Sequence, residues 1–306
     1  MSIAICIVGF RNVADIIRCL AALDGSTYAD FNVVICENGG EAAFAALAAA
    51  APQRLTRGQP IDLVMAPRNL GYAGGVNLCL THTPEAEAWW VLNPDTQPAP
   101  DALEHMAARL KVGDVAAVGC TICTPEGEVE SRGGHWRASM ARAVSLEHGK
   151  SLDESVDAET IESQLSYLSG ASMLVGPAFV KTAGIMREDY FLYAEEVEWC
   201  LRAQALGLKL GIAAAAHVVH HQGSTTGSVA DISGRSRTAV YLDERNKMLV
   251  TRDCFSARLP MAALAAFLLI FLRFARRRAW SQLGFALQGW VAGLRNRRGP
   301  PAWIQP

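Results

Sequence analysis

The sequence predicts an α/β fold, a mostly parallel sheet flanked by helices, and three observations support this prediction. Short apolar runs alternate with stretches of helical spacing over the first 120 residues. The strand-like runs are apolar throughout, as expected for parallel strands buried on both faces. Polar clusters follow them, where ligands bind at the carboxyl ends of parallel strands. Strict alternation of this kind favours helices on both faces of one sheet.

The elements of the first part follow from this alternation. Runs rich in β-branched and apolar residues predict strands over residues 3–8, 31–36, 61–65, 88–92 and 115–120. Apolar residues at helical spacing predict helices over 12–23, 41–51 and 100–110, and a glycine-rich turn that leads into a helix over 69–81. We expect a ligand to bind at the carboxyl ends of the strands of this part, which extends to about residue 120.

The later elements are less regular. Residues 125–164 are polar and predict a variable loop segment. Regular structure is expected again over 167–175, with helices over 177–183 and 195–206, the latter stopped by Gly207. A last strand over 208–214 would lead to His217, His220 and His221. The chain then reads as helical from about 236, so we expect one domain over 1–235 and a helical extension over 236–306.

Charge is distributed unevenly along the chain. The 306 residues carry a net charge of −2 and are 51% hydrophobic, which excludes global disorder. Residues 254–306 hold eight Arg and no acidic residue, so the rest carries −10. Because these Arg flank apolar runs, we expect them to meet an anionic membrane surface and not nucleic acid. The alternative is a helical hairpin that packs on the catalytic domain or forms a dimer interface. The oligomeric state is not predicted.

Two features bear on location. The apolar run over 259–272 contains Pro260 and is shorter than the roughly 20 residues that span a membrane, so we expect it at the membrane interface. The first residues have no basic leader and enter a strand at once. Eight scattered cysteines fit reduced thiols. We therefore expect a cytoplasmic protein, peripheral at the inner face of the membrane.

A run from Trp90 to Thr96 ends a predicted strand in Asn93-Pro94-Asp95-Thr96. A carboxylate at the open end of a rigid strand suits a divalent cation, which takes carboxylates and substrate phosphates as ligands. The sequence therefore predicts Mg²⁺ or Mn²⁺ at Asp95, although Asn-Pro-Asp is also an ordinary turn.

A glycine-rich turn precedes the predicted helix at 69–81. Its small residues and helix N-terminus suit a phosphate, although a tight turn would need the same residues. It is neither a dinucleotide fingerprint nor a P-loop, which disfavours a dehydrogenase.

An acidic cluster begins the predicted helix at 195–206. Glu195 and Glu198 share one face, and an aromatic run precedes them. Such surroundings raise the proton affinity of a carboxylate, which a general base needs, although acids also favour a helix N-terminus for its dipole.

Taken in order, these motifs resemble the family 2 inverting glycosyltransferases of GT-A fold, especially their rhamnosyltransferase-like and galactofuranosyltransferase-like bacterial members. The resemblance covers about residues 3–250. It is carried by Phe10-Arg11-Asn12, Ile35 to Gly40, Asn69 to Asn77, Leu92 to Thr96, Gly170 to Leu174, Phe191 to Arg202, His220 to Gly223 and Arg245-Asn246. Glu37, Glu196 and Glu198 stand where the family usually has Asp.

The resemblance implies a role for each motif. It implies a nucleotide-diphosphate sugar (UDP- or dTDP-sugar) as donor, bound by Val8, Phe10, Asn12, Glu37, Asn38, Asn69, Gly71, Gly74, Gly75, Asn77, Asn93 and Asp95. It implies metal ligands Asp95 and His220, a base at Glu196 with Glu195 in reserve, and acceptor-side residues Gly170, Ala171, Glu198 and Arg202. The acceptor would be a hydroxyl of a glycan or lipid-linked molecule in bacterial cell-surface polysaccharide synthesis.

Two other functions compete with this interpretation. A catalytically inactive sugar-nucleotide-binding or scaffold protein would fit the Asp-to-Glu replacements. A nucleotidylyltransferase would share the fold, but Gly9-Phe10-Arg11-Asn12 lacks the glycine-rich signature with Arg and Lys that such enzymes carry.

Overall fold

The computed structural model describes residues 1–221 and 232–304, and its first part is an alternating α/β unit. Its elements are β1 (Ile3–Gly9), α1 (Val13–Asp24), β2 (Phe31–Glu37), α2 (Glu41–Ala50), β3 (Ile61–Met65), α3 (Gly71–His82), β4 (Ala88–Leu92), β5 (Thr96–Pro98), α4 (Ala102–Lys111) and β6 (Ala117–Cys123). The predicted strands and helices of this part are all present, with bounds shifted by three residues at most.

The second part contains shorter elements and then the C-terminal helices. They are β7 (Val129–Ser131), β8 (Gly134–Arg137), β9 (Arg142–Ser145), α5 (Ala158–Gln164), β10 (Ser172–Val175), α6 (Pro177–Ala183), α7 (Glu195–Ala205), β11 (Leu210–His220), α8 (Arg237–Cys254), α9 (Leu259–Ala275) and α10 (Trp280–Leu294). Short 3-10 turns join several of them. Two expectations are corrected: residues 125–164 form a hairpin and a helix, and the last strand continues to His220.

One sheet organises the molecule, in the order β3-β2-β1-β4-β10-β6-β11-β5, with β7 paired to β6. The pairs β1–β2, β1–β4, β2–β3 and β6–β11 are parallel. β10 runs antiparallel between β4 and β6, and β5 runs antiparallel to β11. The sheet is thus mostly parallel, as predicted, and the β8–β9 hairpin stands apart from it.

Burial explains why the strands are continuous apolar runs. Every residue of β1, β4 and β6 is buried, because one face of the sheet packs on α1 and α4 and the other on α3. The two faces belong to separate hydrophobic clusters. At ~25 cal/mol per Å² of apolar surface, such two-sided burial is the main stabilising contribution to the sheet.

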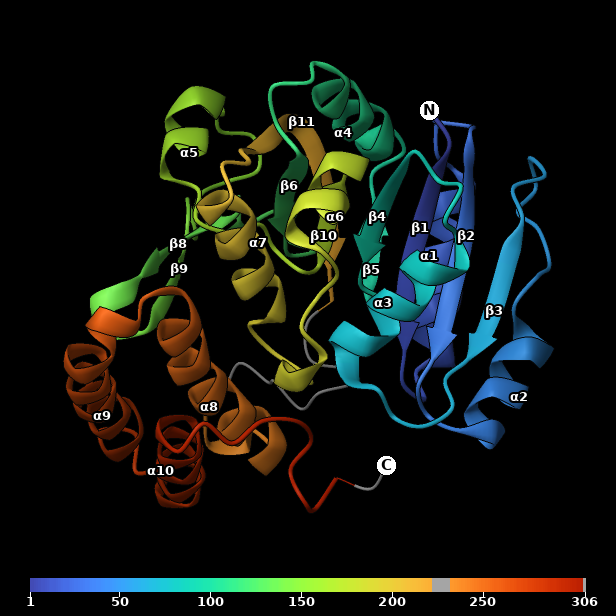
Figure 1. Cartoon of the computed structure of the whole chain (residues 1–306). Helices are drawn as coiled ribbons and strands as arrows, with labels where there is room; N and C mark the ends of the chain where they lie inside the picture. The colour runs from blue at the N-terminus through green and yellow to red at the C-terminus, as the bar shows by residue number, and fades with distance from the viewer. Residues whose placement is uncertain (222–231, 305–306) are drawn as a thin grey trace.

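The C-terminal helices α8, α9 and α10 gather beside α7 and the β8–β9 hairpin, far from β2 and β3 (Figure 1). Met248, Leu249 and Val250 of α8 belong to the same core cluster as β4. Helical structure does not continue to the last described residue, since α10 ends at Leu294. The division between domains at residue 235 stays a prediction.

Helix α9 corrects the expectation that its apolar run is too short to span a membrane. Pro260 does not interrupt it, because it lies in the first turn, where its missing N–H has no helical partner. With the preceding turn, Ser256–Ala275 forms 20 residues of mean hydropathy 1.8, long and apolar enough to cross a membrane by length and composition alone. Only 22% of that window is buried.

Candidate functional site

Asp95 and His220 lie side by side at one edge of the sheet. The strand that follows Asp95 pairs with β11 in register Thr96–His220, and the backbone N–H of His221 donates to the carbonyl of Asp95. This pairing brings the Asp95 carboxylate within 3.3 Å of His220 Nε2. Glu130 lies on the other side of the ring, 3.2 Å from Nδ1. The sequence did not point to Glu130, which comes from the segment predicted to be a loop.

This arrangement fits a divalent cation. A carboxylate oxygen and an imidazole nitrogen 3.3 Å apart can both reach one ion. Glu130 would orient the ring, as a carboxylate behind a metal-bound His commonly does. Burial opposes the charge on the ring, but hydrogen bonds to Asp95 and Glu130 raise the pKa of His220 to about 9. Within the described ranges no group of three His, Cys, Asp or Glu side chains is placed to hold a metal ion.

The first amides of the glycine-rich turn form hydrogen bonds within the protein, and the donor contacts of Asn69 and Gly71 stay predictions. The N–H of Leu70 donates to Asn38 Oδ1, and that of Gly71 donates to Asn69 Oδ1. The N–H of Tyr72 donates to the carbonyl of Phe191 at 2.8 Å. Gly71 has φ +72°, and a Cβ there would lie 2.1 Å from the same carbonyl. The start of α3 is therefore closed by the loop before α7.

The remaining polar and small residues of α3 also have structural roles. Asn77 is 3% exposed and exchanges hydrogen bonds with both backbone groups of Met186. A Cβ on Gly75 would lie 2.5 Å from Val8, and one on Gly74 would lie 2.6 Å from Leu70. Both glycines are buried and allow close packing, and the donor contacts of Gly74, Gly75 and Asn77 stay predictions.

The ends of β1 and β2 are joined by buried polar groups. Glu37 is fully buried, and its Oε1 accepts from the N–H groups of Arg11 and Gly39. Its other oxygen has no partner among the residues that the structure describes. Asn38 is 4% exposed, and both ends of its amide are used by the turn before α3. Glu37 and Asn38 thus join the ends of β1 and β2 to the turn before α3, and their contacts with the donor stay predictions.

Three other predicted donor residues lie at this end of the sheet. Phe10 is half-buried, with the Arg11 guanidinium 5.2 Å from its ring centroid. Asn12 Oδ1 accepts from the N–H of Phe10. Val8 is 8% exposed. Their contacts with a nucleotide stay predictions.

The loop directly before the acidic helix α7 has a strained backbone. Phe191, Tyr193 and Ala194 all have positive φ, at 69°, 72° and 64°. Non-glycine residues in this region cost about 1–3 kcal/mol each and persist only where the surroundings fix them. Ala194 is the residue immediately before α7, so the strain lies directly beside Glu195 and Glu196.

The side chains of Arg245 and Asn246, on α8, form hydrogen bonds with the backbone of this loop. The Asn246 amide donates to the carbonyls of Tyr190, Leu192 and Tyr193 at 3.0, 2.8 and 2.6 Å. Arg245 donates to the carbonyl of Tyr190 at 2.7 Å. Both side chains are buried, at 1% and 0% exposure. The Arg-Asn pair therefore satisfies the carbonyls that the strained loop turns inward.

Glu196 lies beside Gly170: a Cβ added to Gly170 would lie 3.3 Å from the side chain of Glu196. Burial raises the pKa of Glu196 to about 7. Glu195 is 2% exposed, and burial together with the neighbouring Glu196 raises its pKa well above the usual range. Tyr72 lies between these acids and Asp95: its pKa is raised by burial and by the charges of Glu195, Glu196 and Asp95, and its hydroxyl donates to the carbonyl of Gly170.

The predicted acceptor-side residues divide into two groups. Gly170 and Ala171 lie at the site, where the carbonyl of Ala171 accepts from the N–H of Asn93. Glu198 and Arg202 form a bidentate ion pair, and Arg202 also donates to the carbonyls of Ala183 and Ile185. This pair fastens α7 to the segment after α6. The place of Glu198 and Arg202 on the acceptor side stays a prediction.

Two residues were missed by sequence reasoning. Tyr72 was hidden inside a glycine-rich turn, and Glu130 lay in a polar segment with no periodicity. The signal for Tyr72 is its place beside a glycine of positive φ, which only the structure reveals. Gly223, at the end of the predicted His-x-x-Gly motif, lies outside the described residues.

Fold and site together define a sugar-transferring enzyme of the GT-A type. The model of "Glycosyl transferase family 2" matches residues 4–168, more than half of the chain, and the protein belongs to this family of glycosyltransferases. It is similar to the low-salt glycan biosynthesis hexosyltransferase Agl10 of Haloferax volcanii, with 22% identity over 76% of this chain and 75% of that one. It is also 28% identical to the N-acetylglucosaminyl-diphospho-decaprenol L-rhamnosyltransferase of Mycobacterium tuberculosis, over 69% and 73%.

Solved structures show the same fold. S. aureus TarS superposes with a TM-score of 0.55 and 13% identity, over 97% of this chain and 82% of that one. The mannosyltransferase PcManGT of Pyrobaculum calidifontis, solved with GDP-Man and Mn²⁺, gives 0.55 and 15% over 96% and 87%. These likenesses confirm the predicted GT-A fold.

Proposed function

We propose that this glycosyltransferase moves a sugar from a nucleotide-diphosphate donor to a hydroxyl of a glycan or lipid-linked acceptor, with inversion at the anomeric carbon. One observation carries the proposal. A partly buried Glu196, whose pKa of about 7 suits a general base, shares one site with the Asp95–His220 pair, through Tyr72 and Gly170. A base for the acceptor hydroxyl and a cation site for the donor diphosphate are what a metal-dependent inverting transfer requires.

The base takes the proton. Glu196 accepts the proton of the acceptor hydroxyl, and that oxygen attacks the anomeric carbon while the bond from this carbon to the diphosphate breaks. The nucleoside diphosphate leaves with the bonding electrons, and no sugar becomes attached to the enzyme. A general base of matched pKa contributes roughly 10²–10⁴-fold to the rate.

The donor lies at the carboxyl ends of β1, β2 and β4. Asp95 and His220 would hold Mg²⁺ or Mn²⁺, which when bound neutralises charge on the diphosphate. Glu195 is buried, and one of its oxygens lacks a partner among the described residues. Burial and the charge of Glu196 raise the pKa of Glu195 well above its usual range. Glu195 is the reserve base beside Glu196.

The place of action follows from the C-terminal region. The exposed apolar side chains of α9 and the Arg residues after it suit an anionic membrane surface. The relative from Mycobacterium tuberculosis is named for a lipid-linked substrate. We infer a peripheral enzyme that works at the cytoplasmic face of the membrane.

Donor binding tests the proposal. Calorimetry or thermal shift with UDP-, dTDP- and GDP-sugars, with and without Mn²⁺, would be measured on wild type, Asp95→Asn and the control Asp62→Asn, an exposed acid on β3. We expect metal-dependent binding of one donor in wild type and control only. Binding without transfer, unchanged by Glu196→Gln, would instead indicate an inactive sugar-nucleotide-binding protein.

A further inference from the structure

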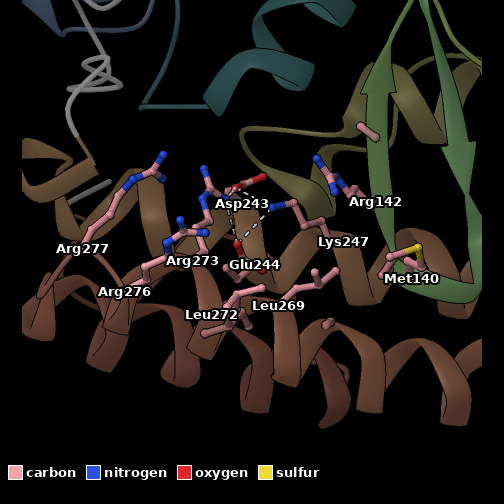
Figure 2. Close-up of a pocket in the computed structure, with 14 residues that line it drawn as sticks. Met140, Arg142, Asp243, Glu244, Lys247, Leu269, Leu272, Arg273, Arg276 and Arg277 are labelled. Atoms are coloured by element: carbon pink, nitrogen blue, oxygen red, sulfur yellow. Dashed lines mark hydrogen bonds and ion pairs between the residues drawn. The ribbon is translucent and has the colours of Figure 1, made fainter.

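A pocket of about 880 Å³ lies between the β8–β9 hairpin, α8 and α9. Figure 2 shows its charged side chains facing the hollow, with Leu269 and Leu272 of α9 below them. Its lining includes five cations and two acids: Arg142, Lys247, Arg273, Arg276 and Arg277, with Asp243 and Glu244. The donor site described above does not use this pocket.

The cations of the pocket exceed its acids. Lys247 Nζ lies 2.7 Å from Asp243 and 3.0 Å from Glu244, so the two acids already have a partner. Arg142, Arg276 and Arg277 form no ion pair within the described part of the chain and are exposed. Five positive and two negative charges leave a surplus of three, which favours an anion with more than one negative charge.

A neighbouring arginine shows the repulsion that this surplus creates. Burial and the nearby charge of Arg273 lower the pKa of Arg235, and Arg277 adds to the effect. Cations that lower each other's proton affinity gain from an anion placed between them. Arginine is suited to that task, since its planar fork can bind phosphate oxygens in pairs.

The pocket opens onto an apolar surface. Met261, Leu264, Leu268 and Leu272 follow one another at helical spacing along the outer face of α9 and are 47%, 64%, 58% and 61% exposed. Leu272 lines the pocket as well. An occupant that carries both phosphate and hydrocarbon would match the two surfaces together, whereas a soluble sugar phosphate would leave the stripe uncovered.

The pocket also adjoins the catalytic acids. Asp243, on its wall, is close enough to raise the pKa of Glu196 further, after the larger effect of burial. Helix α8 packs on α7, which carries Glu196. A sugar attached to a phosphate in the pocket would therefore lie on the same side of the molecule as the base.

We propose that this pocket binds the diphosphate of a lipid-linked acceptor, whose hydrocarbon lies along the apolar stripe of α9. The inference rests on the proposed transferase function and adds to it the chemical class of the acceptor. A diphosphate diester carries two negative charges, which suits the surplus of three better than the single charge of most phospholipid phosphates.

Farnesyl diphosphate is the probe. Its binding to the full chain would be measured by calorimetry on wild type, on R276Q/R277Q and on R295Q/R297Q, which removes two equally exposed arginines outside the pocket. We expect affinity to fall at least tenfold in the first variant and less than twofold in the second. Farnesol and inorganic pyrophosphate should each bind at least tenfold more weakly than farnesyl diphosphate. Farnesol can contact only the apolar stripe of α9, and pyrophosphate can contact only the cationic pocket.

Donor binding in the same samples separates this inference from the proposed function. If a nucleotide sugar binds while farnesyl diphosphate does not, or if both double variants lose equal affinity, the pocket assignment is wrong and the transferase stands. Displacement of the probe by phosphatidylglycerol vesicles, but not by neutral phosphatidylcholine vesicles, would assign the pocket to phospholipid headgroups and overturn it too. If no nucleotide sugar binds in any sample, the proposed function itself fails.

Discussion

At the scale of single residues, the proposed base is a carboxyl group whose pKa lies near neutral pH. Burial raises the pKa of Glu196 to about 7, whereas Glu198, two residues further along the helix, is ion-paired with Arg202. Two acids of one helix thus have different chemistry because their partners differ. The extra methylene of Glu, relative to the usual Asp, is accommodated where Glu196 passes Gly170, since a Cβ there would meet its side chain at 3.3 Å.

The first prediction concerns pH. A base acts only when ionised, and the ionised fraction of Glu196 increases as pH rises through about 7. We expect kcat/KM to rise about tenfold per unit below pH ~6 and to level off above ~8. Initial rates over pH 5–9 measure this, with thermal unfolding at each pH to separate loss of structure. A flat profile across pH 6–8 would remove Glu196 from the role of base.

The second prediction concerns the same residue. Glu196→Gln should lower kcat by roughly 10²–10⁴-fold and leave donor affinity within about twofold, because it removes the base and not the donor contacts. Glu41→Gln is the matched control, an exposed acid in the first turn of α2. An equal effect on donor affinity and kcat would mean that Glu196 shapes the donor site.

The third prediction concerns Asn246. Its amide donates to three carbonyls of a loop with three positive-φ residues. Asn246→Ala should lower the free energy of unfolding by about 2–4 kcal/mol, from three hydrogen bonds at ~1 kcal/mol each plus buried carbonyls left unpaired. Chemical denaturation would measure it, with Asn32→Ala of β2 as control. A loss below ~1 kcal/mol would show that the loop is held elsewhere.

At the scale of elements, α3 is the clearest case of what the sequence could and could not predict. Its existence followed from helical spacing after Asn69, and its start at Gly71 was near the expected place. Its role does not follow from the sequence alone, because a glycine-rich turn before a helix suits a phosphate and also suits close packing. The close packing depends on the contact with Phe191, which is distant in sequence and which no local pattern encodes.

The same reasoning applies to strands. Apolar runs predicted β1, β2 and β4 well, since burial on both faces leaves a strong local signal. The antiparallel direction of β10 and the length of β11 could not be predicted, because they depend on pairing partners distant in sequence. The proximity of Asp95 and His220 was predicted through family resemblance, whereas Glu130 became visible only with this pairing.

The fourth prediction tests α3. Gly71→Ala forces a left-handed φ on alanine and places a Cβ against the Phe191 carbonyl. Gly58→Ala imposes a similar φ, +93°, in open space. We expect Gly71→Ala to cost at least ~2 kcal/mol more in free energy of unfolding than Gly58→Ala, and to lower activity, since it displaces the loop before Glu195. Equal costs would mean that the contact with Phe191 is dispensable.

At the scale of the whole molecule, α9 lies far from β2 and β3 (Figure 1). Around α9 the protein exposes apolar and basic side chains, among them Leu264, Leu268, Arg276 and Arg277. Ala262, Ala266, Ile270 and Phe274 bind α9 to the protein, while its outer stripe is uncovered. The geometry suits a helix that lies in the membrane interface with its inner face on the enzyme.

The fifth prediction follows from this geometry. The double variant Leu264→Ser/Leu268→Ser should bind vesicles that contain phosphatidylglycerol at least tenfold more weakly. It removes two leucine side chains from the acyl region of the membrane, and burying each contributes ~1.5–3 kcal/mol to the binding free energy. Stability should hardly change, because both side chains are exposed. Leu206→Ser, at the end of α7 and 54% exposed, is the control. Sedimentation with vesicles measures this, and equal binding by all three proteins would contradict it.

The hydrogen bonds that fix the strained loop have a consequence for folding during synthesis. Arg245 also donates to the carbonyl of Gly299, whose N–H donates to Asp189, while Arg298 pairs with Asp189 and Asp253. The loop beside the catalytic acids therefore leaves the ribosome more than a hundred residues before the segment that fastens it. At ~5–20 residues per second, several seconds pass in which the sheet can form while the site is incomplete. A nascent chain would thus acquire its sugar-transferring activity only after its Arg-rich end has been synthesised and folded back.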